Sequence, residues 1–144
     1  TAHEDIPKPS FITNEKLLKT LSFHSGHMNL DAKARRILKK IAKESKLNNS
    51  SHRIEVRGFA DAEPIGGFEG KRHKPIHSFS SQLALSAARA QSVAKALADA
   101  GVDSNIIHSE GFGSTNFIAD NKTRAGRSKN RRVEIYLITN SSPE

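Results

Sequence analysis

The chain of 144 residues contains no cysteine, and aromatic side chains make up only 6% of it. The absence of cysteine excludes disulfide frameworks, thiol nucleophiles, iron–sulfur clusters and zinc sites built on thiolates. No apolar run approaches the roughly 18 residues that a membrane-spanning helix needs. A chain of this length has room for one hydrophobic core, so we expect a single domain.

Positive charge is what the sequence has in excess. It contains 23 Lys and Arg against 15 Asp and Glu, a formal net charge of +8, which favours an anionic partner. Nucleic acid is one such partner. However, the basic residues are spread along the chain and aromatic side chains for base stacking are scarce, so we expect no nucleic acid to bind.

Three regions are distinguished along the chain. Residues 1–20 carry Pro7 and Pro9 and few periodic apolar positions, which predicts a lead-in or tether. Residues 21–140 form the expected domain and residues 141–144 a tail. The chain starts with Thr1 instead of methionine, so we expect that a signal peptide or membrane anchor preceded it.

The periodicity of apolar residues predicts alternating strands and helices. The expected order is a strand at 21–23, a helix opened by Asn29, a strand at 54–59, a long loop at 62–80, a helix at 81–100, a strand from 106 to 111, a short helix at 123–128 and a strand at 132–138. Gly101 supplies the stop of the second helix. This order predicts an α/β fold, an α+β sandwich in which helices pack on one face of a mixed sheet.

Two charged residues come together in this arrangement. Asp61 ends the strand at 54–59, and Arg89 lies one to two turns into the following helix. A carboxylate and a guanidinium so placed can face each other across one edge of the sheet. From these two residues alone, an internal salt bridge is the simpler interpretation.

Three ordered motifs extend the pattern: G-F-A-D at 58–61, L-S-A-A-R-A at 85–90 and G-R-S-K-N-R-R-V-E-I at 126–135. Together they resemble the OmpA C-terminal-like domain, the peptidoglycan-binding module of outer-membrane protein A, Pal lipoproteins and MotB stator subunits. The resemblance covers about residues 21–138. The long spacing between Asp61 and Leu85 is most similar to the MotB branch.

The resemblance implies a ligand and a site. The ligand is the peptide stem of peptidoglycan, whose diaminopimelate side chain ends in an ammonium and a carboxylate. Asp61 resembles the residue that takes the ammonium, and Arg89 the one that takes the carboxylate. An ionised Asp only accepts hydrogen bonds, and the planar fork of Arg matches a carboxylate, so the chemistry suits these roles. Secondary ligand-binding positions are Ala60, Gln82, Leu85 and Arg127.

Arg127, Asn130 and Arg131 share the third motif. Their first interpretation is structural, in which they orient the loop beneath the site. The functional interpretation places Arg127 beside the ligand or beside the Asp61 carboxylate. Elsewhere the chain departs from the family pattern, at Ala60, Gln82, Leu83 and Phe117.

The resemblance also implies a cellular context. We expect a non-catalytic periplasmic domain, without cofactor, of an inner-membrane-anchored protein in a Gram-negative bacterium. A membrane channel partner would associate through a region that precedes this chain, and members of the MotB branch commonly pair, so a homodimer is a further expectation. The alternatives are an OmpA-like fold that has lost strong wall binding and acts as a protein-interaction module, or a basic nucleic-acid-binding domain.

Four histidines suggest further chemistry. His73 and His77 lie in the basic loop, which is either a solvated insertion or a pH-sensitive rim that attracts anionic wall polymer. His24 and His27 lie near Asp31, but no third ligand is in sight. We therefore expect no metal site.

Overall fold

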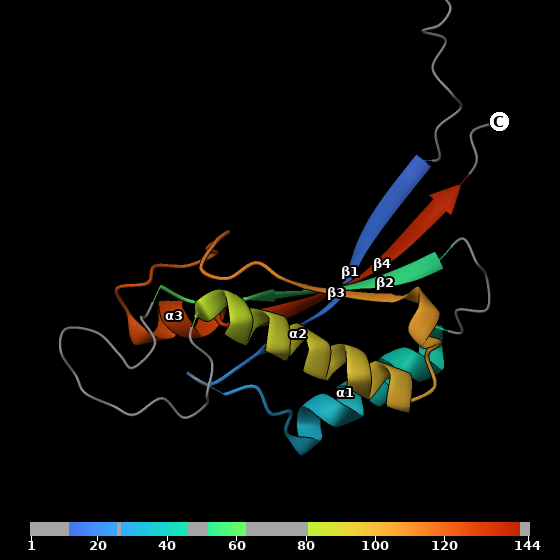
Figure 1. The fold of residues 1–144 in the computed structure, drawn as a ribbon, viewed down its shortest axis with the longest axis horizontal. Coiled ribbons are helices and arrows are strands. Elements are labelled where there is room, and N and C mark those ends of the chain that lie inside the picture. Colours follow the sequence, from blue (N-terminus) through green and yellow to red (C-terminus); the bar gives the residue numbers. More distant parts are fainter. Residues whose placement is uncertain (1–11, 26, 46–51, 63–80, 142–144) are drawn as a thin grey trace, which may run out of the picture.

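The computed structural model describes residues 12–25, 27–45, 52–62 and 81–141. The elements in chain order are β1 (Ile12–Ser22), α1 (Ala32–Ser45), β2 (His52–Phe59), α2 (Gln82–Asp99), a 3₁₀ turn (Ser104–Ile106), β3 (Ile107–Gly111), α3 (Arg124–Asn130) and β4 (Arg132–Ser141) (Figure 1). Within the described ranges, the helices are too short or too polar to cross a membrane.

The four strands form one mixed sheet in the order β1-β4-β2-β3. β4 runs antiparallel to both of its neighbours, whereas β2 and β3 are parallel and are connected by α2. Figure 1 shows α1 and α2 on the same side of this sheet. The expected α+β fold, a mixed sheet with helices on one face, is confirmed.

The hydrophobic core lies between the sheet and these two helices. Its side chains come from every second residue of β2 and β4 and from the apolar stripes of α1 and α2, as the two periodicities predict. The most deeply buried of them are Ile54, Val56, Val133, Ile135, Leu38, Val93 and Leu97. Each large apolar side chain buried in this way contributes about 1.5–3 kcal/mol.

β1 is longer than the sequence predicts. The expected strand at 21–23 is only its end, because pairing with β4 runs from Ile12 opposite Ser141 to Ser22 opposite Arg132. Residues 12–20 are therefore part of the sheet and not a lead-in. β1 is an edge strand whose charged residues face solvent, and Leu17 is 49% exposed. A strand held mainly by backbone pairing leaves no apolar alternation in its sequence.

The helix boundaries differ in one place. α1 begins at Ala32 and not at Asn29, and the capping group is the Oδ1 atom of Asp31, which accepts a hydrogen bond from the backbone N–H of Ala34 at 2.7 Å. α2 ends as expected, since Gly101 follows it with a φ of +115°, which favours glycine.

Two glycines determine how closely α2 approaches the sheet. Gly58 of β2 and Gly111 of β3 are partners in the parallel register. A Cβ atom on Gly58 would lie 2.1 Å from the carbonyl oxygen of Ser86, and one on Gly111 would lie 2.4 Å from the backbone nitrogen of Ala87. The backbone of α2 therefore rests directly on the two strands, and this contact positions Arg89 one turn later.

Candidate functional site

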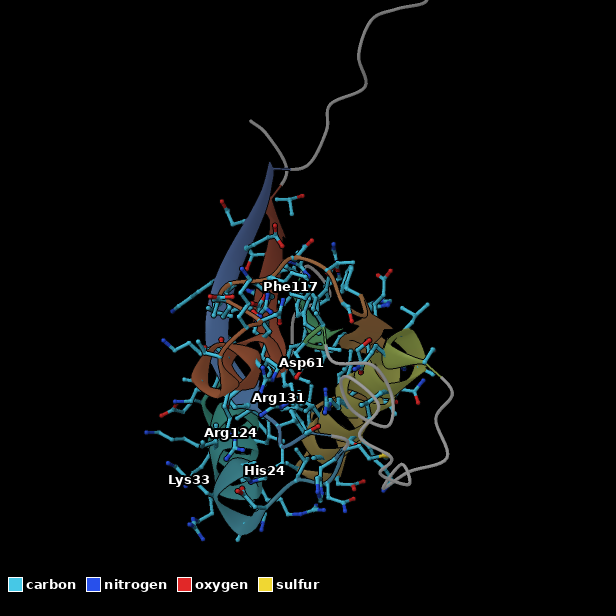
Figure 2. The ribbon with its side chains drawn as sticks, turned by 90° about the vertical axis from the view of Figure 1, so that its left-hand side faces the viewer. His24, Lys33, Asp61, Phe117, Arg124 and Arg131 are labelled. Carbon is cyan, nitrogen blue, oxygen red and sulfur yellow. The ribbon has the colours of Figure 1, made fainter. Side chains whose placement is uncertain are left out.

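Asp61 lies just beyond the end of β2 and is almost completely buried, with 2% of its surface exposed. Its Oδ2 atom accepts a hydrogen bond from Nη1 of Arg131 at 2.8 Å. The hydroxyl of Ser114 donates to its backbone carbonyl oxygen. Figure 2 shows Asp61 and Arg131 beside each other. The carboxylate is thus held in one orientation by a charge-assisted contact.

Arg131 connects three parts of the chain. It follows α3, its Nε atom donates to the carbonyl oxygen of Phe23 at 2.8 Å, and its own carbonyl accepts from the backbone N–H of Phe23 at 2.9 Å. Its side chain is 11% exposed. Arg131 therefore joins the end of β1, the start of β4 and Asp61.

The sequence leaves two interpretations of Arg127, a structural one and one that places it beside the ligand or beside Asp61. The hydrogen bond to Oδ2 of Asp61 comes from Arg131. Nη1 of Arg127 donates to the carbonyl oxygen of Asn121 at 2.9 Å. The two arginines are four residues apart, about one helical turn, and belong to the same motif, so the pattern does not distinguish them. The sequence feature that could have identified Arg131 is its position immediately before β4. This strand pairs with β2, and Asp61 lies just beyond the end of β2.

Arg89 is fully buried in α2. Its Nε atom donates to the carbonyl oxygen of His27 at 2.8 Å, and Nη2 donates to that of His24 at 3.0 Å. Its Cζ atom lies 5.4 Å from the centre of the Phe23 ring. The third nitrogen, Nη1, is buried and has no hydrogen-bond partner among the described residues. The guanidinium is thus fixed on one side and unsatisfied on another.

The electrostatics of this cluster are unbalanced. Burial lowers the pKa of Arg89 to about 10, the positive charge of Arg131 acts in the same direction, and the negative charge of Asp61 opposes them. These three side chains comprise two guanidinium groups and one carboxylate, a formal net charge of +1. A buried, incompletely paired cation is costly, and an anion placed at Nη1 relieves that cost.

Asp61 and Arg89 come close enough to influence each other electrostatically, but they do not form the direct salt bridge that the two residues alone suggest. Asp61 pairs with Arg131, and Arg89 is held by two carbonyl oxygens. The two groups are therefore not saturated by each other. Among the described residues, Nη1 of Arg89 remains without an acceptor.

Three of the secondary positions lie next to Asp61 in the chain or on the same helix as Arg89. Ala60 is fully buried, and its backbone N–H donates to the carbonyl oxygen of Gly113 at 2.9 Å. Leu85 is 1% exposed, one turn before Arg89, and Gln82 is half-buried in the first turn of α2. His73 and His77 lie outside the described residues, so the expected rim is not placed.

Asn130 organises the loop that follows β3. It is fully buried, its Oδ1 atom accepts from two backbone N–H groups of that loop, and its amide nitrogen donates to Oδ1 of Asn121 at 2.8 Å. The same atom of Asn121 accepts from the backbone N–H of Ala62 at 3.2 Å. This chain of contacts fastens the loop next to Asp61 and agrees with the structural role expected for Asn130.

The rings of His24 and His27 meet edge to face, with centroids 5.9 Å apart. Across the part of the chain that the structure describes, His, Cys, Asp and Glu side chains form no group of three that could hold a metal ion.

The amino-acid sequence is similar to those of known proteins over part of its length. Residues 22–131 match the family described as the OmpA family. Motility protein B of Helicobacter pylori strain J99 is 39% identical over 89 residues, which cover 62% of this chain and 31% of that protein. Outer membrane protein A of Bordetella avium is 50% identical over 56 residues, 39% of this chain and 29% of that protein. The matched region thus spans less than a third of these relatives.

Solved structures are similar over more of the chain. A crystal structure of the periplasmic domain of Helicobacter pylori MotB aligns with a TM-score of 0.69 at 28% identity and covers 92% of this chain and 76% of that one. The cell wall anchor of the type VI secretion system (T6SS) from Pseudomonas aeruginosa aligns with a TM-score of 0.69 at 26% identity, covering 90% and 88%.

Proposed function

The chain belongs to the OmpA family, and from this premise we propose that it is a non-catalytic peptidoglycan-binding domain that anchors its parent protein to the cell wall. Relatives described as a motility protein, a peptidoglycan-binding protein and a cell wall anchor support this proposal. The buried charged cluster at the end of β2 supplies the recognition chemistry.

The ligand group that fits the cluster is the diaminopimelate of the stem peptide. Its carboxylate would accept a hydrogen bond from the buried, unpartnered Nη1 atom of Arg89, and its ammonium would donate to the Asp61 carboxylate. The observation that carries the proposal is this unsatisfied nitrogen within a cluster of net charge +1. A ligand carboxylate removes the imbalance, and the ligand ammonium remains paired with Asp61.

Arg131 has a supporting role in this proposal. It fixes Asp61 through Oδ2, and its contacts with Phe23 keep its own side chain from moving away. A carboxylate can accept several hydrogen bonds, so a ligand ammonium adds to the Arg131 contact without replacing it. Arg131 is thus a positioning residue.

The burial of both charged groups has a kinetic consequence. Asp61 is 2% exposed and Arg89 fully buried, so the site must open for a ligand to enter. Association should therefore be slower than the roughly 10⁵–10⁷ M⁻¹s⁻¹ typical of preformed protein surfaces. Stopped-flow measurement with a fluorescent muropeptide checks this rate.

The test of the proposed function uses Arg89→Lys. This substitution keeps the positive charge but removes the guanidinium, which bonds the carbonyl oxygens of His24 and His27 and would bond the ligand carboxylate. Isolated sacculi should sediment the wild-type domain. In calorimetry, the variant should lose about 2–5 kcal/mol of binding free energy for a diaminopimelate muropeptide, the range for truncating one partner of a buried charge pair. A stem peptide with lysine in place of diaminopimelate should bind weakly to both proteins.

The control is Arg53→Gln, which removes an arginine from the open face of the sheet and should bind like the wild type. Thermal unfolding confirms that each variant is folded. If folded wild-type protein fails to sediment with sacculi, the OmpA-like fold acts instead as a protein-interaction module. Release of muropeptides from the sacculi would contradict a non-catalytic role.

We further propose the setting of the parent protein. It would be an inner-membrane-anchored protein of a Gram-negative bacterium, with this domain in the periplasm, a channel partner bound through a preceding region, and a homodimeric assembly. The similarity to both MotB and a secretion-system anchor supports wall anchoring of an envelope machine. Cross-linking of the full-length protein in cells tests both the partner and the dimer.

A further inference from the structure

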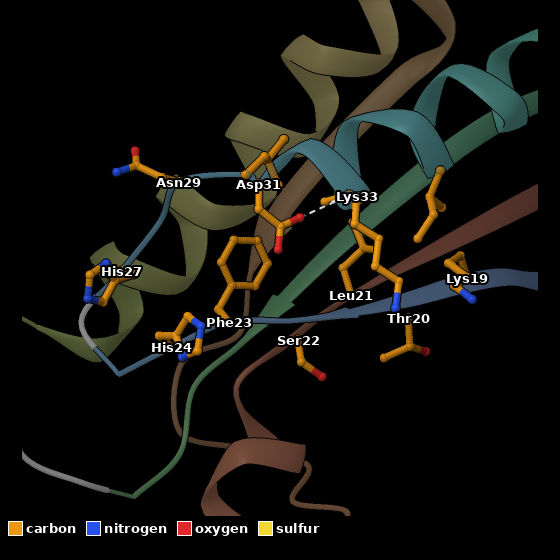
Figure 3. A pocket seen from close by; sticks show the side chains of 13 residues that line it. Lys19, Thr20, Leu21, Ser22, Phe23, His24, His27, Asn29, Asp31 and Lys33 are labelled. Carbon is orange, nitrogen blue, oxygen red and sulfur yellow. Dashed lines mark hydrogen bonds between the residues drawn. The ribbon is translucent and has the colours of Figure 1, made fainter.

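A second cavity lies beside the charged cluster. It has a volume of about 520 Å³, is open to solvent on one side and is lined by the end of β1, the segment that follows it and the first turns of α1 (Figure 3). This volume is within the roughly 300–1,000 Å³ of small-ligand sites. The proposed function makes no use of it.

The lining of this cavity combines an apolar floor with a basic rim. Leu21 and Phe23 belong to the buried core and form part of the floor. Figure 3 shows the side chain of Lys33 extending from α1 toward the end of the cavity where Lys19 lies. His24 and His27 lie at the opposite end of the cavity. The acidic residue in the lining, Asp31, uses Oδ1 to cap α1. Such a lining suits an anion that carries a small alkyl group.

The cavity and the charged cluster share one turn of the chain. The carbonyl oxygens of His24 and His27 accept from Arg89, whereas the residues themselves line the cavity. The backbone N–H of His27 donates to the carbonyl of His24 at 3.0 Å, so one hydrogen-bonded turn contacts Arg89 through its carbonyl oxygens and contributes His24 and His27 to the cavity lining.

We propose that this cavity is a second subsite of the wall-binding site and takes the carboxylate-terminated D-alanine that follows diaminopimelate in the stem peptide. The inference rests on the proposed function. The methyl group would lie on the floor formed by Leu21 and Phe23, and the carboxylate would lie between Lys19 and Lys33. Diaminopimelate would bind to Arg89, which lies on the other side of this turn.

The experiment compares two muropeptides, a tripeptide that ends in diaminopimelate and a tetrapeptide with the additional D-alanine, by calorimetry. The wild-type domain should bind the tetrapeptide about fivefold more tightly, the upper range for an exposed charge pair. Lys19→Gln combined with Lys33→Gln should reduce tetrapeptide affinity to that of the tripeptide and leave tripeptide binding unchanged.

A matched control removes two lysines elsewhere on α1. Lys40→Gln combined with Lys43→Gln gives the same change in net charge outside the cavity and should keep the tetrapeptide preference. In ¹⁵N NMR spectra, the D-alanine should add shifts at residues 19–22 and 33–37 to those around Arg89.

Four outcomes overturn the inference. A wild-type domain that binds both peptides equally, or a Lys19/Lys33 variant that keeps the preference, shows that the cavity does not read D-alanine, while the proposed function stands. Loss of binding to phosphatidylglycerol vesicles in that variant, with both muropeptide affinities unchanged, assigns the cavity to a lipid headgroup. Failure of either peptide to bind the wild type overturns the proposed function together with the inference.

Discussion

Two clusters of arginine and carboxylate groups differ in burial and in charge balance. On the open face of the sheet, Arg57 bonds to Glu55 at 2.9 Å and also to Glu15, and Arg53 bonds to Glu55 at 3.3 Å. We call these four residues the surface ladder. Their side chains are 25–48% exposed, and two positive charges face two negative ones. The buried cluster of Asp61, Arg89 and Arg131 has two positive charges and one negative.

The two clusters show how burial changes the effect of an unbalanced charge. In the surface ladder, the hydrogen bond from Arg57 lowers the pKa of Glu55, and partial burial opposes this effect. Water completes whatever the side chains leave unsatisfied, so such pairs stabilise little. In the buried cluster, no described residue accepts a hydrogen bond from Nη1 of Arg89, and the net positive charge of the three side chains favours an anionic ligand. Charge imbalance in a buried position therefore points to binding, whereas balanced surface pairs do not.

The substitution Asp61→Asn should affect the buried cluster most. It removes the carboxylate of the buried cluster and leaves Arg89 and Arg131 as neighbouring buried cations. We expect the free energy of unfolding to fall by about 3–5 kcal/mol. Urea denaturation measures the change. A loss below 1 kcal/mol would show that the Asp61 carboxylate contributes no more to the free energy of unfolding than an exposed pair of the surface ladder.

A second substitution, Gly58→Ala, should affect the buried cluster and not the surface ladder, because it displaces α2, the helix that carries Arg89. The added Cβ atom would lie 2.1 Å from the carbonyl oxygen of Ser86, so the helix must shift away from the sheet. We expect a loss of about 1–3 kcal/mol of stability, the cost of overpacking, together with weaker muropeptide binding, because Arg89 moves with the helix. Unchanged binding in the folded variant would show that this close approach does not position Arg89.

The smallest effect is expected in the surface ladder, where Glu55→Gln should cost about 1 kcal/mol or less at pH 7. Because the folded-state pKa of Glu55 is lowered from 4.5, its contribution is present above pH 4.5 and is lost as pH falls through the folded-state pKa. The difference in unfolding free energy between wild type and variant should therefore vanish in acid. A difference that persists at pH 2 would contradict an electrostatic origin.

The elements that pack against the core were predictable from the sequence. The stripe of α2 and the alternation of β2 and β4 record which side of each element is buried, and the structure places them accordingly. β1 was largely missed. Its first residues face solvent and are held by backbone pairing with β4, an interaction that every non-proline residue can make and that no side-chain pattern records.

Part of the candidate site was predictable as well. The motifs located Asp61 and Arg89 at one end of the sheet, but they did not single out Arg131 as the residue that donates to the Asp61 carboxylate. The contact between Asp61 and Arg131 joins residues 70 positions apart, and that between Arg131 and Phe23 joins residues 108 positions apart. Such contacts depend on how α3 ends against β4, which the motif does not encode.

The residue pattern along the chain was enough to predict the kinds of element, their order, the basic character of the protein and the position of Asp61 and Arg89 near the end of a strand. Local periodicity and motif chemistry carry that information because each depends on neighbours along the chain. The packing of the elements sets which arginine pairs with Asp61, leaves Nη1 of Arg89 buried with no partner among the described residues, and forms a basic cavity beside it. These features arise where separate elements meet, and their geometry depends on packing distances of a few ångströms.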